Sequence, residues 1–177
     1  MSFDQRDFRN ALGTFGTGVT IISTRGLDGR AYGMTANSFS GVSLDPPLVL
    51  WSLAMKSPNA AAFRSATHFG VSILALDQLA LSRQFSRPAP DKFEGVATVA
   101  GAGGVPLIAG AAARFECRTE YCCLGGDHLI IVGRVAHYAY ERKSTLLFCQ
   151  GRYQRGQELE PAADANQELA TAWSGLA

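Results

Sequence analysis

The sequence has no excess of charge of either sign and no long hydrophobic run. Its 16 Lys and Arg against 15 Asp and Glu leave a formal net charge of +1 at pH 7. Nothing in this balance favours a nucleic acid or an anionic membrane as a partner. No apolar run approaches the roughly 20 residues of a membrane-spanning helix, and the amino terminus lacks the features of a secretory signal. We therefore expect a cytoplasmic protein.

Motifs for metal binding and for nucleophilic catalysis are also missing. The four cysteines, Cys117, Cys122, Cys123 and Cys149, do not form a pair of Cys-x-x-Cys clips. Reduced strand cysteines are the main expectation, and a zinc site is a minority alternative, so we expect no metal site. A serine hydrolase is disfavoured because there is no Gly-x-Ser-x-Gly elbow.

The dinucleotide-binding fingerprint of parallel α/β proteins is absent too. Glycines gather at residues 13–18 and 101–104, but neither cluster lies between a strand and a helix in the required GxGxxG pattern. The second cluster has Pro106 where the last glycine should stand. Any nucleotide must therefore bind to this chain in another way.

What the chain does contain is a succession of short strand patterns. A chain of 177 residues that is 47% hydrophobic can form one domain over residues 1–177, with a core at about 8–155 and a polar tail at about 156–177 that adds a helix or frays. We expect strands at 19–24, 31–35, 48–53, 69–74, 113–122 and 128–140, and helices at 4–12, 58–65 and 77–84. About six or seven strands against three short helices predict a mainly β, antiparallel barrel with peripheral helices.

The most informative segment covers residues 33–50, where polar side chains stand in a strand before Pro46-Pro47 and an apolar strand that we expect to be buried on both faces. Hydroxyl and amide groups here can bond a heteroaromatic ring or a phosphate, and none is a strong acid, base or nucleophile. These groups are Thr35, Asn37, Ser38 and Ser40. The alternative is that they only satisfy a bulge or a turn.

Four further groups could contact a ligand. Lys56 and Ser57 stand at the start of the helix expected at 58–65, which suggests an anion site, or else a surface lysine beside a capping serine. Arg83, Arg87 and Lys92 surround a connection with Phe85 and Phe93 that covers a ligand or is a solvated loop. His128 follows a glycine turn, and residues 148–153 form an aromatic cluster or the closing strand of the barrel.

Together, these segments resemble the flavin reductase family with the flavin-binding split-barrel fold. The motifs are Gly33-Met34-Thr35-Ala36-Asn37-Ser38-Phe39, Val42-Ser43-Leu44-Asp45-Pro46-Pro47-Leu48-Val49, Gly126-Asp127-His128 and Gly151-Arg152-Tyr153. The likeness runs from about Phe8 to Tyr153. Members are the NAD(P)H:flavin oxidoreductase components of two-component flavin-dependent monooxygenases.

The resemblance implies an antiparallel Greek-key split barrel, a homodimer, and a flavin at or near the dimer interface. Its motifs assign the isoalloxazine and ribityl contacts to Thr35, Ala36, Asn37 and Ser38, and the phosphate contacts to Ser52, Lys56 and Ser57. His128 would position the nicotinamide nucleotide, with Arg152 and Tyr153 beside the same pocket. Ser43 and Phe85 complete the expected set.

The implied activity is hydride transfer from NADH, with NADPH possible, to FMN or FAD, which delivers reduced flavin to a partner monooxygenase. Since this chemistry needs positioning rather than acid–base catalysis, no catalytic side chain is expected to be essential. Two alternatives stay open. The chain could bind flavin without reductase turnover, or reduce another acceptor, such as a cobalt corrinoid or an iron chelate, through a bound flavin.

Overall fold

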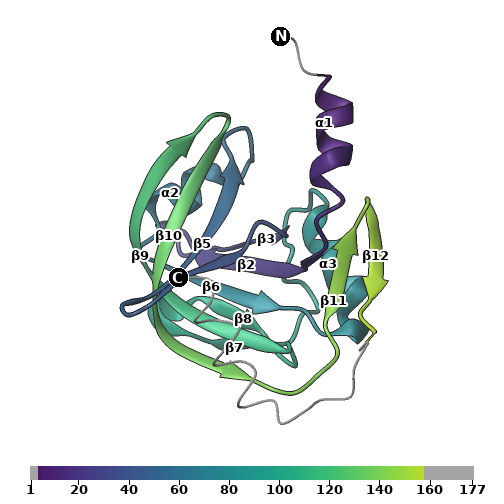
Figure 1. Cartoon of the computed structure of the whole chain (residues 1–177). Coiled ribbons are helices and arrows are strands. Elements are labelled where there is room, and N and C mark those ends of the chain that lie inside the picture. The colour runs from purple at the N-terminus through teal and green to yellow at the C-terminus, as the bar shows by residue number, and fades with distance from the viewer. Residues whose placement is uncertain (1–3, 158–177) are drawn as a thin grey trace.

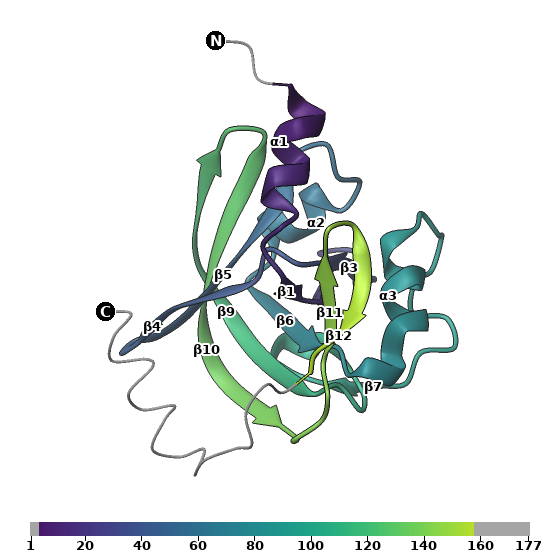
Figure 2. The same ribbon diagram turned by 45° about the vertical axis from the view of Figure 1, so that its right-hand side comes forward.

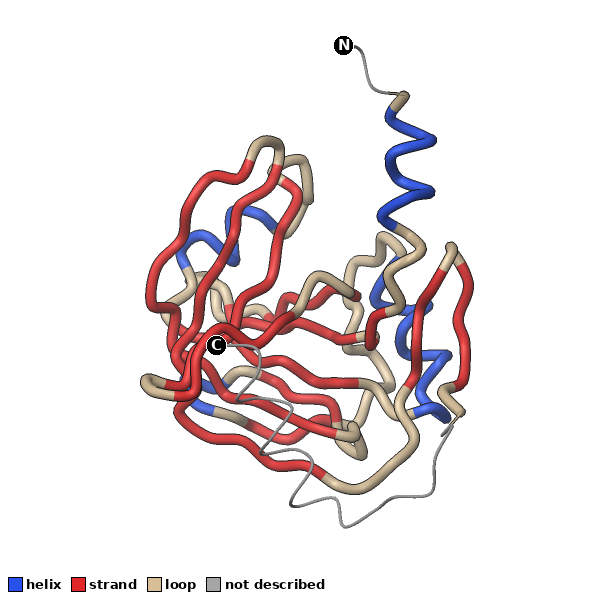
Figure 3. Tube along the Cα trace, viewed as in Figure 1, coloured by secondary structure: helices blue, strands red, loops and turns tan. Residues whose placement is uncertain are grey.

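A seven-stranded antiparallel sheet forms the body of the protein in the computed structural model, which describes residues 4–157 (Figure 1). Its strand order is β3-β2-β6-β9-β10-β5-β4. The strands are β2 (Thr20–Arg25), β3 (Ala31–Ala36), β4 (Ser40–Leu44), β5 (Pro47–Ala54), β6 (His68–Ile73), β9 (Ala113–Gly125) and β10 (His128–Tyr140). The predicted mainly β, antiparallel architecture is confirmed, and strands dominate the described chain (Figure 3).

Two smaller sheets flank this body. One joins β1 (Thr17–Gly18), β11 (Leu146–Cys149) and β12 (Arg152–Arg155), and the other joins β7 (Thr98–Ala100) and β8 (Pro106–Ile108). Of the two alternatives for residues 148–153, a single strand that closes the barrel is excluded. The chain reverses at Gln150 and Gly151, whose φ angles are 50° and 73°, so that β12 pairs back on β11.

The helices are short and peripheral. They are α1 (Gln5–Leu12), α2 (Ala60–Ser65) and α3 (Leu79–Ser86), with 3-10 turns η1 (Leu76–Gln78) and η2 (Ala102–Gly104). Two predicted starts are wrong: α2 begins at Ala60 rather than Pro58, and Asp77 lies inside η1 rather than capping α3. The predicted end at residue 84 is also too early, since α3 continues to Ser86.

Helix α1 stands away from the sheet (Figures 1 and 2). The Asp4 carboxylate caps it, accepting hydrogen bonds from the backbone N–H groups of Arg6 at 2.7 Å and Asp7 at 3.2 Å. None of its residues is buried. Within residues 4–157, no helix is long and apolar enough to cross a membrane. The helix or frayed tail expected near the carboxyl end falls largely on residues 158–177, outside the described residues.

Two hairpins join neighbouring strands of this sheet. β2 and β3 pair from Thr20↔Ala36 to Arg25↔Ala31. β10 has the predicted bounds, whereas β9 continues three residues beyond the predicted end, because only Gly126 and Asp127 make the turn. Gly126 has a φ of 64°, a conformation that glycine adopts without strain.

The main core lies against one face of β5. Val49, Trp51 and Leu53 are buried, while the alternate residues of the strand are partly exposed. The prediction that this strand is buried on both faces is therefore wrong, because core side chains cover only one of them. Trp51 packs edge-on against Phe63 of α2 at 4.9 Å between ring centroids.

Candidate functional site

A groove of three adjoining pockets follows the chain from Met34 to Ser38. The α2-side pocket, of about 630 Å³, lies between the start of α2 and the connection after α3. The middle pocket, of about 210 Å³, shares Thr35 and Ser86 with it. The α1-side pocket, of about 880 Å³, shares Asn37 and Phe148 with the middle pocket. The polar segment picked out from the sequence therefore runs the length of the groove.

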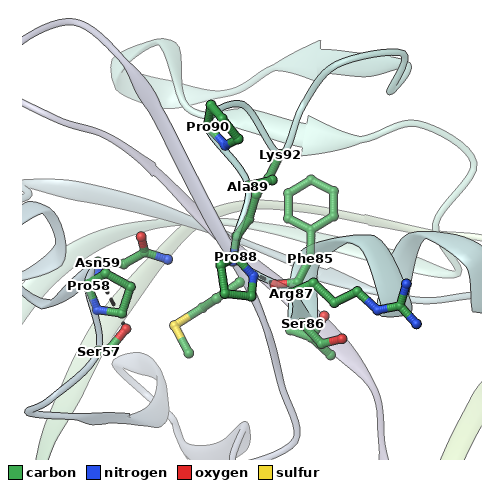
Figure 4. Close-up of a pocket in the computed structure, with 12 residues that line it drawn as sticks. Ser57, Pro58, Asn59, Phe85, Ser86, Arg87, Pro88, Ala89, Pro90 and Lys92 are labelled. Carbon is green, nitrogen blue, oxygen red and sulfur yellow. Dashed lines mark hydrogen bonds between the residues drawn. The ribbon is translucent and has the colours of Figure 1, made fainter.

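The α2-side pocket is lined on two sides by separate loops (Figure 4). One wall is Ser57, Pro58 and Asn59, and the other is the segment from Phe85 to Pro90. The Asn59 side-chain amide donates a hydrogen bond to the Gly33 carbonyl at 3.1 Å, which ties the first wall to β3.

The second wall is held in place by its own polar contacts. The Lys92 ammonium donates to the Phe85 carbonyl at 2.8 Å, and the Gln84 amide donates to the Lys92 carbonyl at 3.0 Å. The Arg30 guanidinium donates to the Pro90 carbonyl at 3.0 Å. Burial lowers the pKa of Lys92 from its usual 10.5. Because these contacts hold the connection in place, it fits a segment that covers a ligand better than it fits a solvated loop.

Two of the hydroxyls expected to contact flavin are engaged within the protein. Thr35 Oγ1 donates to the Ser82 carbonyl at 2.7 Å. Ser38 Oγ accepts from the Ser52 N–H at 2.9 Å and donates to the Ser52 carbonyl at 3.1 Å. Asn37, by contrast, is exposed on the groove, and β3 has already ended at Ala36. The prediction that the polar segment forms one strand is therefore wrong. The backbone of Ser52 holds the Ser38 hydroxyl in place.

The far wall of the middle pocket is aromatic. Phe148 of β11 and Tyr153 of β12 pack edge to face, with their ring centroids 5.3 Å apart. The Tyr153 hydroxyl lies 2.9 Å from Ser82 Oγ on α3. The β11–β12 hairpin, for which the sequence left an aromatic cluster or barrel closure open, therefore forms a wall of the candidate site.

Lys56 and His128 lie together, but outside the three pockets. His128 Nδ1 is 2.7 Å from Asp127 Oδ1, and this hydrogen bond, aided by the Lys56 charge, holds the pKa of Asp127 below its usual 3.8. The Met55 N–H donates to the Asp127 carbonyl at 3.0 Å. The cluster adjoins the groove through Ser57, the neighbour of Lys56 that lines the α2-side pocket.

The remaining expected site residues fall elsewhere. Ser43 lies on β4 and Arg152 is exposed on β12, and neither lines the three pockets. Phe85, by contrast, lines the α2-side pocket as expected, although its side chain is fully buried. Sequence reasoning missed several lining residues, namely Arg9, Asn10, Thr14, Asn59 and Ser86. For the missed residues next to α1, the glycine cluster at 13–18 was the available sequence signal.

Comparisons with known proteins agree with this arrangement. The family model described as "Flavin reductase like domain" matches residues 12–157. The chain is 46% identical over 152 residues to the "FMN reductase (NADH) SmoA" of Agrobacterium fabrum, covering 86% of each protein. It is 40% identical over 148 residues to the reductase component of a flavin-dependent trigonelline monooxygenase from Acinetobacter baylyi, covering 84% of this chain and 48% of that protein.

A solved structure gives the same result. The NADH:FAD oxidoreductase SgcE6 of Streptomyces globisporus, in complex with NAD and FAD fragments, superposes with a TM-score of 0.84 at 36% identity. The alignment covers 89% of this chain and 96% of that one. The antiparallel fold is therefore that of flavin reductases with solved structures. The chain belongs to the flavin reductase-like domain family, which confirms the resemblance found in the sequence.

Proposed function

We propose that this chain is an NADH-dependent flavin reductase that reduces FMN or FAD and supplies the reduced flavin to a partner monooxygenase. The observation that carries the proposal is the groove along Thr35–Ser38 in a chain 46% identical to an NADH-dependent FMN reductase. The similar reductase components of monooxygenases support the delivery role. Some of these relatives are about twice as long as the matched region, so their full activities are not transferred to this chain.

The chemistry of the groove fits a flavin nucleotide. Among the described residues that line the three pockets, none is acidic, whereas Arg9, Arg87 and Lys92 are basic. A phosphate-bearing ligand is therefore favoured over a cation. The aromatic wall of Phe148 and Tyr153 suits a flat heteroaromatic ring.

We assign the segment Thr35, Ala36, Asn37 and Ser38 to the ring and ribityl chain of the flavin, chiefly through backbone groups and Asn37. Lys56 and Ser57 are assigned to the phosphate, and His128 to the nicotinamide nucleotide. When bound, the flavin accepts a hydride from the reduced nicotinamide. The protein aligns the two rings and excludes water, and no side chain needs to exchange a proton in that step.

We also propose that the chain works as a homodimer. Exposed apolar side chains on α1, just after it and on the β9–β10 hairpin support this, since a monomer rarely leaves so many in water. They include Leu12, Phe15, Tyr121, Leu124, Tyr138 and Tyr140. Sedimentation equilibrium should give twice the chain mass of 18.9 kDa, and a monomer at micromolar concentration would refute the proposal. A cytoplasmic location is proposed because all four cysteines are free thiols, as reducing compartments keep them.

Steady-state NADH oxidation tests the function. Purified protein is mixed with NADH or NADPH and with FMN, FAD or riboflavin, and the nicotinamide absorbance is followed. The proposal predicts rapid oxidation with NADH plus FMN or FAD. Oxidation no faster than without protein would leave only a flavin-binding role. Flavin that stays bound through dialysis would instead favour reduction of another acceptor.

A further inference from the structure

Ser82 connects three elements of the groove without lining it. Its side chain is fully buried on α3. Its carbonyl accepts the hydroxyl proton of Thr35 on β3 at 2.7 Å, and its own hydroxyl lies 2.9 Å from the Tyr153 hydroxyl on β12. One residue of the helix is thus hydrogen-bonded to both of the elements that face each other across the middle pocket.

These bonds determine what the middle pocket offers a ligand. Thr35 and Tyr153 both line that pocket, yet their hydroxyl groups are directed at Ser82. Thr35 has donated its hydroxyl proton and can only accept from a ligand, and the Tyr153 hydroxyl already bonds Ser82, so these residues contribute mainly shape and carbon surface. A slot with apolar walls favours the flat ring of a flavin over its polar tail.

We propose that Ser82 is a positioning residue for the flavin ring: it sets the spacing between β3 and the β11–β12 hairpin and keeps the Tyr153 ring against Phe148. The inference rests on the proposed function and concerns a residue outside the pocket lining. Removing the Ser82 hydroxyl leaves the part-buried Tyr153 hydroxyl without this partner, and such a group turns toward a new one. The Tyr153 ring then shifts into the slot.

The test measures flavin binding by quenching of flavin fluorescence, without NADH, beside steady-state kinetics. Ser82→Ala should weaken flavin binding and raise the flavin KM about tenfold, with kcat and the NADH KM changed less than about twofold. Ser65→Ala is the control, because it also removes a serine hydroxyl from a short helix, where that hydroxyl bonds the Ala61 and Ala62 carbonyls of α2 away from the groove. It should bind flavin like the unaltered protein.

A double variant separates positioning from general loosening. Tyr153→Phe removes the other half of the same hydrogen bond and should weaken binding in the same direction as Ser82→Ala. Ser82→Ala with Tyr153→Phe leaves no unpaired hydroxyl, so it should bind flavin no more weakly than Ser82→Ala alone. Effects that multiply, or a Ser82→Ala protein that binds flavin normally, would overturn the proposal.

Two outcomes need separate treatment. If circular dichroism shows that Ser82→Ala does not fold, Tyr153→Phe decides alone, and unchanged flavin binding in that variant overturns the role of Ser82. If the unaltered protein binds flavin but does not oxidise NADH, the proposed reductase function fails. The binding comparison then still decides whether Ser82 positions the ring.

Discussion

The backbone of Gly33 packs directly against the ring of Phe85. A Cβ added at Gly33 would lie 2.6 Å from Phe85 Cε1 and 2.9 Å from Cζ of Phe93. Phe85 is on α3 and is fully buried, and Phe93 lies in the connection that follows α3. The two rings pack against each other. This close approach is what allows α3 to lie on β3 and to form one side of the groove.

Gly33→Ala should therefore destabilise the fold by about 1–3 kcal/mol, because a buried ring must move to admit the methyl group. Urea unfolding followed by circular dichroism measures the change in the free energy of unfolding. Gly18→Ala is the control, since nothing lies within 4 Å of its added Cβ. Equal stabilities of the two variants would show that the Gly33 contact is not restrictive.

His128→Ala should raise the NADH KM about tenfold and leave kcat within about tenfold of the unaltered enzyme. The reason is that His128 is assigned to holding the nicotinamide nucleotide and not to a proton transfer. Steady-state kinetics with saturating flavin measure both constants. His137→Ala, an exposed histidine on the same strand, is the control. A turnover loss above about a thousandfold with an unchanged KM would mean that His128 acts chemically.

The ion pair of Glu120 and Arg134 predicts a pH dependence of stability. Two hydrogen bonds, at 3.0 and 2.8 Å, hold the pKa of Glu120 below its usual 4.5. A carboxyl whose pKa is lower in the folded state contributes stability above the unfolded pKa, and loses it as the pH falls through the folded pKa.

Glu120→Gln should accordingly be slightly less stable than the unaltered protein at pH 7, and the difference should shrink as the pH falls below 4.5. The effect is small because the pair is solvent-exposed. Urea titrations at several pH values measure it. A stability difference that grows on acidification would contradict the assignment.

Cys117 should be inert to thiol reagents in the folded protein. Burial raises its pKa to about 12, so almost no thiolate forms near pH 8. Cys122 and Cys123 are exposed on β9 and should react first. A disulfide reagent counts the accessible thiols before and after unfolding. Cys117→Ala should leave the native count unchanged and lower the unfolded count by one, whereas a lower native count would mean that Cys117 is accessible.

The sequence predicts the parts of this fold whose signals are local. The β9–β10 hairpin follows from its glycine turn and strand composition, and β10 has the predicted bounds. The start of α3 was not predictable in this way, because Asp77 resembles a cap but lies within a 3-10 turn that precedes the helix.

The same distinction between local and long-range signals applies to the candidate site. The polar motif from Thr35 to Ser38 marks the groove, since uncharged polar groups near a strand end need partners. Which partner each hydroxyl takes depends on contacts between distant segments. Thr35 is bonded to Ser82, 47 residues away in the chain, and Tyr153 is bonded to the same serine, 71 residues away. No local pattern encodes those pairings, so a direct flavin contact was expected for groups that the protein itself engages.

The central claim, that flavin lies along Thr35–Ser38, is tested most directly by a crystal structure of the protein with the flavin that it turns over best. We predict electron density for the isoalloxazine ring in the middle pocket, between the Thr35–Asn37 backbone and the rings of Phe148 and Tyr153. Ring density outside the groove, with the middle pocket filled only by water, would contradict the account.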